Sequence, residues 1–418
     1  PLVQGANLFD NNRGLTWEQP QFVLRNESNG EYFIGQLAWP VNYRMEFCVG
    51  GGLSFKVGPS AVNALRELLP HLPEDPHLLI AEQVNDSVRV AEDRLPEAAD
   101  AVDAAIASAQ GADLVGLYAG GGIHVGFANS YGQRNWMTSH SFNLDFSLYL
   151  RADKAVKSGY AGFDWSDADL AQRMASARAE LAILERPSRK LERGQYRVYL
   201  SPVAMRELLG LLSWDSFGLK HVRTCQSALL RLAEGKETLH AGFNLCENSA
   251  DGVAAGFSAD GFVRPPGIDL VRGGRHAGAL VSARSAREYG EPANGTSAEE
   301  MPDSLDLAAG ELPRAEVAQR LGTGVWINNL WYTNFSDRVA CRITGMTRFA
   351  CFWVEAGQIV APINVMRFDE TLYRVLGDNL MGLTREREMI LDSGTCGGRG
   401  SVSSRFPGAL VEDFNFNL

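Results

Sequence analysis

Residues 321–368 read LGTGVWINNLWYTNFSDRVACRITGMTRFACFWVEAGQIVAPINVMRF. Branched and aromatic residues come in short runs along this stretch, and glycines such as Gly345 and Gly357 interrupt them. Such runs are typical of strands that are joined by tight turns. The stretch therefore predicts that the second half of the chain is rich in strands.

Glycine is frequent in the whole chain, with 43 of 418 residues. Proteins average about 7% glycine, so this is an excess. The glycines follow no strict period, which excludes a collagen-like chain and places them at turns and strand ends. We therefore expect an α+β fold with many short connections.

The first half mixes strand and helix patterns. Residues 140–152 (HSFNLDFSLYLRA) alternate apolar and polar side chains, as a strand with one buried face does. Residues 112–136 predict a β-hairpin that bends at glycines 120–122, and residues 77–84 predict a buried strand. Helices are expected from patterning and caps over residues 60–72, 95–110 and 166–186.

A charged, aperiodic segment at 187–195 (PSRKLERGQ) predicts a domain boundary. We expect an N-terminal sheet-and-helix domain over residues 1–190. Residues 191–418 should form a strand-rich domain of mainly antiparallel, barrel-like sheet. This second domain opens with a strand at 196–200 and a helix that starts at Ser201-Pro202, because proline suits the first helical position.

Composition excludes several classes of protein. The net charge is −11, so a nucleic-acid partner is not expected. The sequence contains no run of about 18 apolar residues, so no membrane span is predicted. The six cysteines form no CxxC pair, and the first residues lack the charged and apolar regions of a signal peptide. We therefore expect a reduced, cytoplasmic protein.

Catalytic motifs are missing. The seven histidines include no i, i+4 pair, and no phosphate loop or GxSxG elbow occurs. Cys396 lies in the glycine-rich run GTCGGRG, where Arg399 could lower the pKa of its thiol. A buried structural cysteine is the alternative. From the residues alone, the chain has no recognisable active site.

Three segments carry a resemblance to a known family. They are 127–150 (FANSYGQRNWMTSHSFNLDFSLYL), 256–290 (GFSADGFVRPPGIDLVRGGRHAGALVSARSAREYG) and the opening stretch 321–368, in which 343–363 is the most specific block. Together they resemble the TldD/PmbA family. The resemblance implies two strands around the Gly273-Gly274 turn and a helix near residues 283–289.

The family works as two related subunits. The TldD-like subunit carries HExxxH on the first helix of the C-terminal domain and binds zinc; the TldE-like (PmbA) subunit lacks that motif. Here the matching helix reads SPVAMRELLGL from Ser201, which places Arg206 and Leu211 at the histidine positions and keeps Glu207. Guanidinium and leucine side chains cannot ligate zinc. The resemblance implies no metal in this chain and zinc in a partner.

The resemblance implies a TldE-like, non-catalytic subunit of a heteromeric zinc metallopeptidase that cleaves unfolded or modified peptides, and maturation of a peptide natural product is one role that it implies. Its partners would be a TldD-like HExxxH subunit and a peptide substrate. A stand-alone or homodimeric enzyme that uses Cys396 and a regulatory binding protein are the alternatives. Candidate interface or substrate residues are the aromatics Trp326, Trp331, Tyr332 and Phe335; packing within a sheet would also explain them.

Overall fold

The computed structural model describes residues 21–26, 32–38, 44–45, 53–56, 67, 69–71, 73–151, 154–392 and 399–417. Most of the helix that was predicted for 60–72 lies outside these residues. Cys396 and the Gly397-Gly398 turn also lie outside them.

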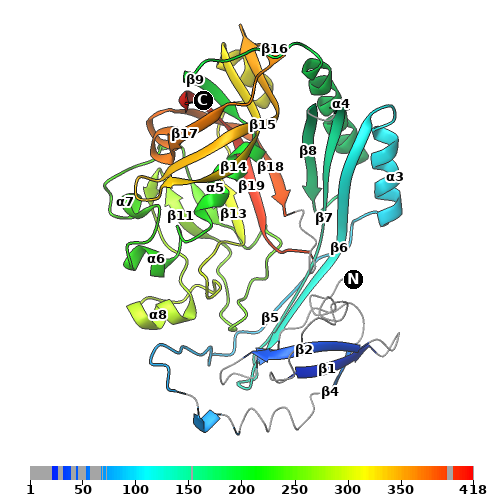
Figure 1. The fold of residues 1–418 in the computed structure, drawn as a ribbon. Coiled ribbons are helices and arrows are strands. Elements are labelled where there is room, and N and C mark those ends of the chain that lie inside the picture. Colours follow the sequence, from blue (N-terminus) through cyan, green and yellow to red (C-terminus); the bar gives the residue numbers. More distant parts are fainter. Residues whose placement is uncertain are drawn as a thin grey trace.

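In the described residues, the first half of the chain forms two small sheets and the helices α3 and α4 (Figure 1). One sheet has the strand order β3-β2-β1-β4, and in the other β7 pairs with β5, β6 and β8. The predicted helices at 95–110 and 166–186 are confirmed as α3 and α4. The bounds are β1 (Gln21–Asn26), β2 (Tyr32–Ala38), β3 (Arg44–Met45), β4 (Leu53–Lys56), a 3-10 turn (Leu69–His71), β5 (Ser87–Val90), α3 (Ala98–Ser108), β6 (Asp113–Ala128), β7 (Arg134–Arg151), β8 (Lys154–Gly162) and α4 (Asp167–Leu184).

Strands β6 and β7 form one long hairpin that runs from the helices to the β1–β4 sheet (Figure 1). The predicted bend at glycines 120–122 is wrong, because β6 passes straight through them and Gly121 pairs with Ser141. The chain reverses instead after Asn129, whose side-chain oxygen accepts hydrogen bonds from the backbone N–H groups of Tyr131 and Gln133. An Asx turn of this kind supplies the local hydrogen bonds that a reversal needs.

Residues 77–84, predicted as a buried strand, are irregular in the structure. The N–H of Glu82 bonds to the nearby carbonyl of Ile80, and the carbonyl of Ala81 accepts from the side chain of Asn129. Leu78 and Val84 are exposed. The apolar run is thus held by local and side-chain hydrogen bonds rather than by a neighbouring strand.

In the part of the second half that the structure describes, the strands form an 11-stranded sheet. Most of its pairings are antiparallel, and β13–β19 and β14–β9 are parallel. The bounds are β9 (Gly194–Leu200), α5 (Pro202–Leu212), α6 (Leu219–Arg223), α7 (Leu230–Ala233), β10 (Leu245–Glu247), β11 (Ile268–Arg272), β12 (Arg275–His276), α8 (Ala283–Tyr289), β13 (Ser304–Leu307), a 3-10 turn (Arg314–Glu316), α9 (Val317–Leu321), β14 (Gly324–Asp337), β15 (Arg342–Glu355), β16 (Gln358–Pro362), β17 (Arg367–Thr371), a π-helical turn (Arg374–Asp378), β18 (Leu380–Leu391) and β19 (Ser403–Phe416).

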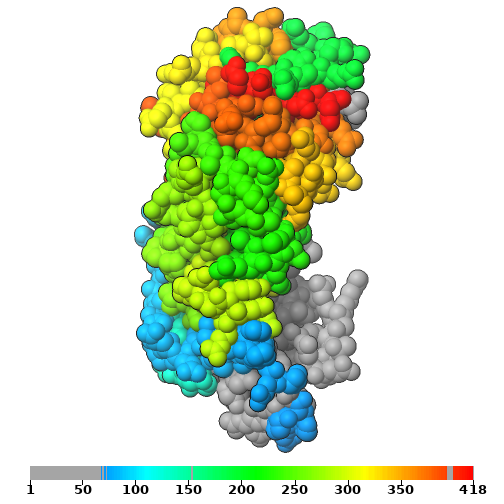
Figure 2. Space-filling model, turned by 90° about the vertical axis from the view of Figure 1, so that its left-hand side faces the viewer, coloured from blue at the N-terminus to red at the C-terminus, as the bar shows by residue number. Residues whose placement is uncertain are grey.

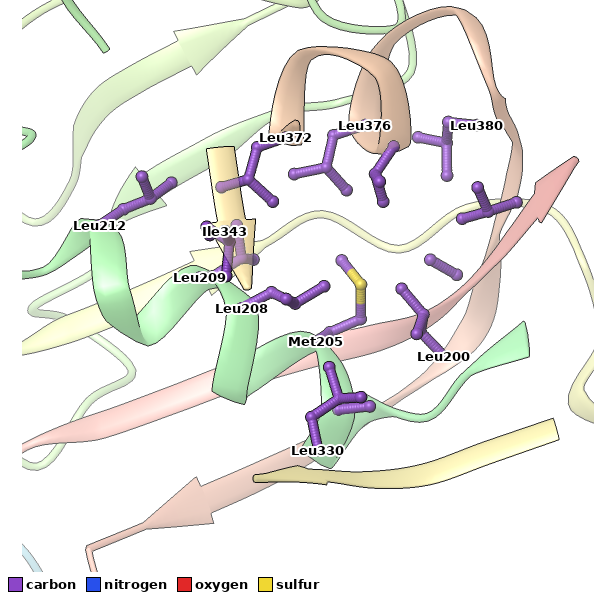
Figure 3. Packing of buried hydrophobic residues seen from close by; sticks show 14 of the residues in the cluster. Leu200, Met205, Leu208, Leu209, Leu212, Leu330, Ile343, Leu372, Leu376 and Leu380 are labelled. Atoms are coloured by element: carbon purple, nitrogen blue, oxygen red, sulfur yellow. The ribbon is translucent and has the colours of Figure 1, made fainter. Parts of the chain in front are cut away.

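Strand pairing in this sheet closes a circuit from β9 through β14, β15, β17 and β19 back to β9. Helix α5 lies against β14 and β19, and its apolar face enters the main core. Figure 3 shows Met205, Leu208 and Leu209 of α5 among leucines of β9, β14 and the turn before β18. The α+β fold with a strand-rich C-terminal half is therefore confirmed.

A second core joins the two halves of the chain. It contains Phe142 and Phe146 of β7, Leu170 and Met174 of α4, and Phe352 of β15, all fully buried. The predicted boundary at 187–195 is itself bonded to the sheet, since the N–H of Arg189 donates to the carbonyl of Pro362 at 2.8 Å. The first and second halves thus share apolar packing on either side of this segment.

Figure 2 shows residues near 200–300, in green to yellow-green, as a continuous band over one face of the molecule. The C-terminal strands lie above this band and residues near 70–130 below it. No helix among the described residues is long and apolar enough to cross a membrane.

Candidate functional site

Two adjoining cavities lie where the β7–β8 and α4 layer meets α5, β14 and β18. The smaller has a volume of about 140 Å³ and the larger about 350 Å³. They share six lining residues, which are Lys157, Ser158, Gly159, Val203, Asn329 and Glu388. We call the two together the interlayer cleft.

Helix α5 brings two charged side chains to this cleft. Ser201 caps the helix, because its Oγ accepts from the N–H of Ala204 at 3.1 Å, and Pro202 follows at the first helical position. With the apolar face of α5 in the core, Arg206 and Glu207 line the smaller cavity. Their charged groups are 4.0 Å apart, and burial raises the pKa of Glu207.

Glu388 of β18 forms ion pairs that connect β18 to α4 and to the turn before α9. It bonds to Arg173 of α4 at 3.3 Å and to Arg314 of the turn before α9. Arg173 also donates to the carbonyl of Gly159 on β8 at 2.8 Å. Burial would raise the pKa of Glu388, but the two guanidiniums outweigh burial and hold this pKa below its ordinary value.

Glu180 of α4 lines the larger cavity and accepts a hydrogen bond from Nδ2 of Asn328 at 2.8 Å. Burial raises the pKa of Glu180 to about 7. Asn328 is held in turn by Trp326, whose indole N–H donates to Oδ1 of Asn328 at 2.8 Å. The cleft therefore contains a carboxyl group whose pKa lies near neutral pH.

Two asparagine side chains line the smaller cavity, Asn143 from β7 and Asn329 from β14. A shift of register between Ile327 and Asn329 interrupts the pairing of β14 with β15. Bulges of this kind re-aim side chains. Here Asn328 contacts Glu180, whereas Asn329 lines both cavities of the cleft.

Sequence patterns missed most of this cleft. Asn143 stands at a polar position of the alternating strand 140–152, where solvent exposure is expected, yet it is buried and lines the smaller cavity together with residues of β18. The Asn328-Asn329 pair inside the apolar run VWINNLWY is the one signal that could have been noticed. Glu180 gave no signal, because its partner lies 148 residues away in the chain.

The four predicted aromatic residues do not form one cluster. Trp326 is buried and packs on Tyr199 with ring centroids 4.3 Å apart, and Phe335 is half-buried. Trp331 and Tyr332 are exposed by 48% and 75%, and the guanidinium of Arg348 lies 4.5 Å from the Trp331 ring centroid. Of the four, only Trp331 and Tyr332 are exposed enough to remain candidates for an interface or substrate surface.

Arg399 reaches the β6–β7 hairpin. Its guanidinium donates to the carbonyl of Gly121 at 2.9 Å and to Oγ of Ser141 at 3.0 Å, and burial lowers its pKa. The predicted partner of Arg399, Cys396, lies outside the described residues. A reactive thiol at Cys396 stays a prediction.

Sequence comparison identifies the class of protein to which this strand-rich fold belongs. Residues 193–417, more than half of the chain, match the family model of the PmbA/TldA metallopeptidase C-terminal domain. The chain therefore belongs to the PmbA/TldD family. No curated protein sequence matches it.

Solved structures of similar fold cover nearly the whole chain. TldE from Thermococcus kodakarensis is 11% identical, with a TM-score of 0.68 over 95% of this chain and 94% of that one. A Thermotoga maritima protein that is labelled a candidate modulator of a DNA gyrase is 14% identical, with a TM-score of 0.69 over 95% and 93%. A Bacteroides thetaiotaomicron protein with a similar label is 13% identical, with a TM-score of 0.66 over 95% and 92%. At these identities the likeness shows the fold.

Helix α5 does not fit a zinc ion. Arg206 lines the cleft with a guanidinium, which is always charged and has no lone pair for a metal. Leu211 packs against the main core. Among the described residues, no group of three or more His, Cys, Asp or Glu side chains is placed to hold a metal. We therefore assign no metal-dependent step to this helix.

Proposed function

We propose that the chain is a non-catalytic, TldE-like subunit of a heteromeric, cytoplasmic metallopeptidase that cleaves unfolded or modified peptides. One observation carries the proposal. Within the part that matches the metallopeptidase domain, α5 keeps its fold and Glu207 but has Arg206 and Leu211 where a zinc-binding helix needs histidines. A TldD-like partner with HExxxH would then supply the zinc.

The exposed aromatic patch supports a docking role. We define it as Trp331 and Tyr332 of β14 with Arg348 and Phe349 of β15. Arg348 lies over the rings of both Trp331 and Phe349, at 4.5 and 5.4 Å from their centroids. Aromatic residues and arginine are enriched in protein interfaces. We propose this patch as the surface that binds the partner subunit.

The test is co-expression of the full chain with an HExxxH-bearing relative from the same genome. We expect the two to co-purify, zinc to be present only in preparations that contain the partner, and an unfolded peptide to be cleaved only by the complex. Stoichiometric zinc and peptidase activity in the chain alone would contradict the proposal and favour a stand-alone enzyme.

Variants of the patch test the docking surface. The double substitution Trp331→Ala and Tyr332→Ala should weaken association with the partner about tenfold or more, because exposed aromatics commonly dominate interface energies. Tyr131→Ala removes an exposed aromatic at the distant β6–β7 turn and is the matched control. If both variants retained wild-type association, measured by titration calorimetry, this surface would be the wrong one.

A further inference from the structure

Two histidines lie side by side on the long β6–β7 hairpin. Gly122 of β6 is paired with His140 of β7, and two residues further along β6, His124 is paired with Thr138. The two histidines are therefore diagonal neighbours on one face of the hairpin, and their ring centroids are 6.1 Å apart. Asn143 of the interlayer cleft stands three positions after His140 on β7, so it points to the opposite face. The histidine pair is thus separate from the cleft.

Gly122 lets the two imidazole rings approach each other. A Cβ atom at this residue would lie 2.7 Å from Nε2 of His124 and 3.2 Å from Cε1 of His140. The ends of both rings therefore converge on the space above Gly122. A larger residue at this position would push against both rings.

Each ring faces a polar partner through Nδ1. Nδ1 of His124 is hydrogen-bonded to Oγ1 of Thr138 at 3.0 Å. Nδ1 of His140 lies 3.2 Å from Oδ2 of Asp93, at ion-pair distance although the two groups are not aligned as a hydrogen bond. Among the described residues, neither Nε2 has a hydrogen-bond partner, and neither is one of the buried atoms that lack one. Nε2 of each ring is therefore available to a ligand.

This arrangement is typical of histidines that bind metal ions. A histidine ligates a metal through the lone pair of one ring nitrogen, and the N–H of the other nitrogen faces a carboxylate, a carbonyl or water. Asp93 favours a proton on Nδ1 of His140, which leaves the lone pair on Nε2. Burial and the neighbouring His140 lower the pKa of His124, so this ring is neutral at pH 7. Imidazole ligands favour zinc, copper and nickel over magnesium and calcium.

The distance between the two rings suits one shared ion. Zinc–nitrogen bonds are about 2.1 Å long, so two imidazole rings that share an ion have centroids up to about 6.4 Å apart. The observed separation of 6.1 Å lies within this reach. The space above Gly122, on which both rings converge, is where such an ion would lie.

We propose that Nε2 of His124 and Nε2 of His140 together bind one zinc ion, or a similar divalent transition-metal ion, with Asp93 as a positioning residue. Among the described residues, no third His, Cys, Asp or Glu completes a group with them, so water fills the other coordination positions. An ion with only two protein ligands exchanges more readily than one in a closed, four-ligand site, and it is lost during purification. The zinc content of the purified chain and its titration with added zinc therefore test different proposals.

Titration of the full chain with zinc chloride, without a partner and after treatment with a chelator, tests the site. We expect calorimetry to show one zinc ion bound here, and about a tenfold or greater loss of affinity in both His124→Gln and His140→Gln, since each removes one of two ligands. His240→Gln, at an exposed position elsewhere, is the control and should bind as the wild type does. Unchanged affinity in either glutamine variant, or equal binding of magnesium chloride, would overturn the shared site.

Copper supplies a spectroscopic readout of the same ligands. With one equivalent of copper(II) chloride, we expect the electron paramagnetic resonance spectrum of the full chain to show hyperfine splitting from two imidazole nitrogens. His124→Gln and His140→Gln should each reduce this number to one. A wild-type spectrum with a single imidazole nitrogen would contradict the proposal.

Two further variants leave both ligands in place. Gly122→Ala fills the space on which the rings converge, so we expect about tenfold weaker zinc binding, whereas Gly382→Ala, where a Cβ meets nothing within 4 Å, is the control. Asp93 is 57% exposed, so its substitution tests positioning without disturbing a core. Asp93→Asn should weaken zinc binding about tenfold and Asp93→Glu should preserve it. Wild-type affinity in Gly122→Ala would show that the ion does not lie there, and wild-type affinity in Asp93→Asn would remove Asp93 from the site.

Discussion

Nothing in the sequence distinguishes Glu180 from a surface glutamate, but its environment in the structure shifts its pKa. Burial raises its pKa from 4.5 to about 7, although the hydrogen bond from Asn328 acts in the opposite direction. Between these two values the folded state retains a proton that the unfolded state has lost. Folding therefore takes up a proton in this range, and the contribution of Glu180 to stability falls as the pH rises.

We expect Glu180→Gln to flatten this dependence. The wild type should lose stability between pH 5 and pH 8, and the variant should lose less, by on the order of 1 kcal/mol after screening by solvent. Urea unfolding at the two pH values measures the difference. Glu185→Gln, at the exposed end of the same helix, is the control. Identical slopes in wild type and Glu180→Gln would refute the assignment.

At the start of helix α5, the side chain of Ser201 makes both a local and a long-range hydrogen bond. The Oγ of Ser201 accepts from the N–H of Ala204 and donates to the carbonyl of Asn328 at 2.7 Å. A single hydroxyl thus caps the helix and fixes it to β14. The position of Arg206 and Glu207 in the cleft depends on this attachment.

Ser201→Ala should therefore cost more stability than loss of an ordinary cap. We expect a loss of about 2 kcal/mol, from the cap and from the buried carbonyl that loses its donor. Ser166→Ala removes the corresponding cap of α4, where Oγ accepts from Asp169, and should cost about 1 kcal/mol. Urea denaturation compares the two variants. Equal losses would mean that the bond to Asn328 contributes nothing.

At the scale of the whole molecule, the shared apolar core matters most. Phe146 and Phe352 belong to the same buried cluster although they come from opposite sides of the predicted domain boundary. The segment between them is also bonded to the sheet, with the guanidinium of Arg189 4.4 Å from the ring centroid of Trp353. The interlayer cleft lies along this junction, so its geometry depends on both halves.

We expect residues 73–417 to unfold in one cooperative transition, because the shared core couples the two halves. Phe352→Ala should lower the stability of the whole unit by about 3–5 kcal/mol. Calorimetry, together with limited proteolysis at 187–195, checks this expectation. Two resolved transitions in the wild type, or rapid cleavage within 187–195, would show that the halves fold independently.

Several features could be predicted from neighbouring residues alone. The alternation of Phe142, Leu144 and Phe146 predicted β7, and serine caps predicted the starts of α4 and α5. These signals span a few residues, because caps and side-chain alternation are set by local backbone geometry. The glycines at 120–122 misled for the same reason, since glycine permits a bend but does not require one.

The sequence by itself determined that Arg206 and Leu211 of α5 cannot bind zinc, because a side chain without a lone pair for the metal cannot ligate it in any fold. The tertiary structure alone decided where the cleft lies and which groups it leaves without partners. Asn143 and Asn329 are far apart in the chain, and their burial depends on how two layers pack. Desolvation and hydrogen bonding at such a site arise from contacts between distant elements, which no local pattern encodes.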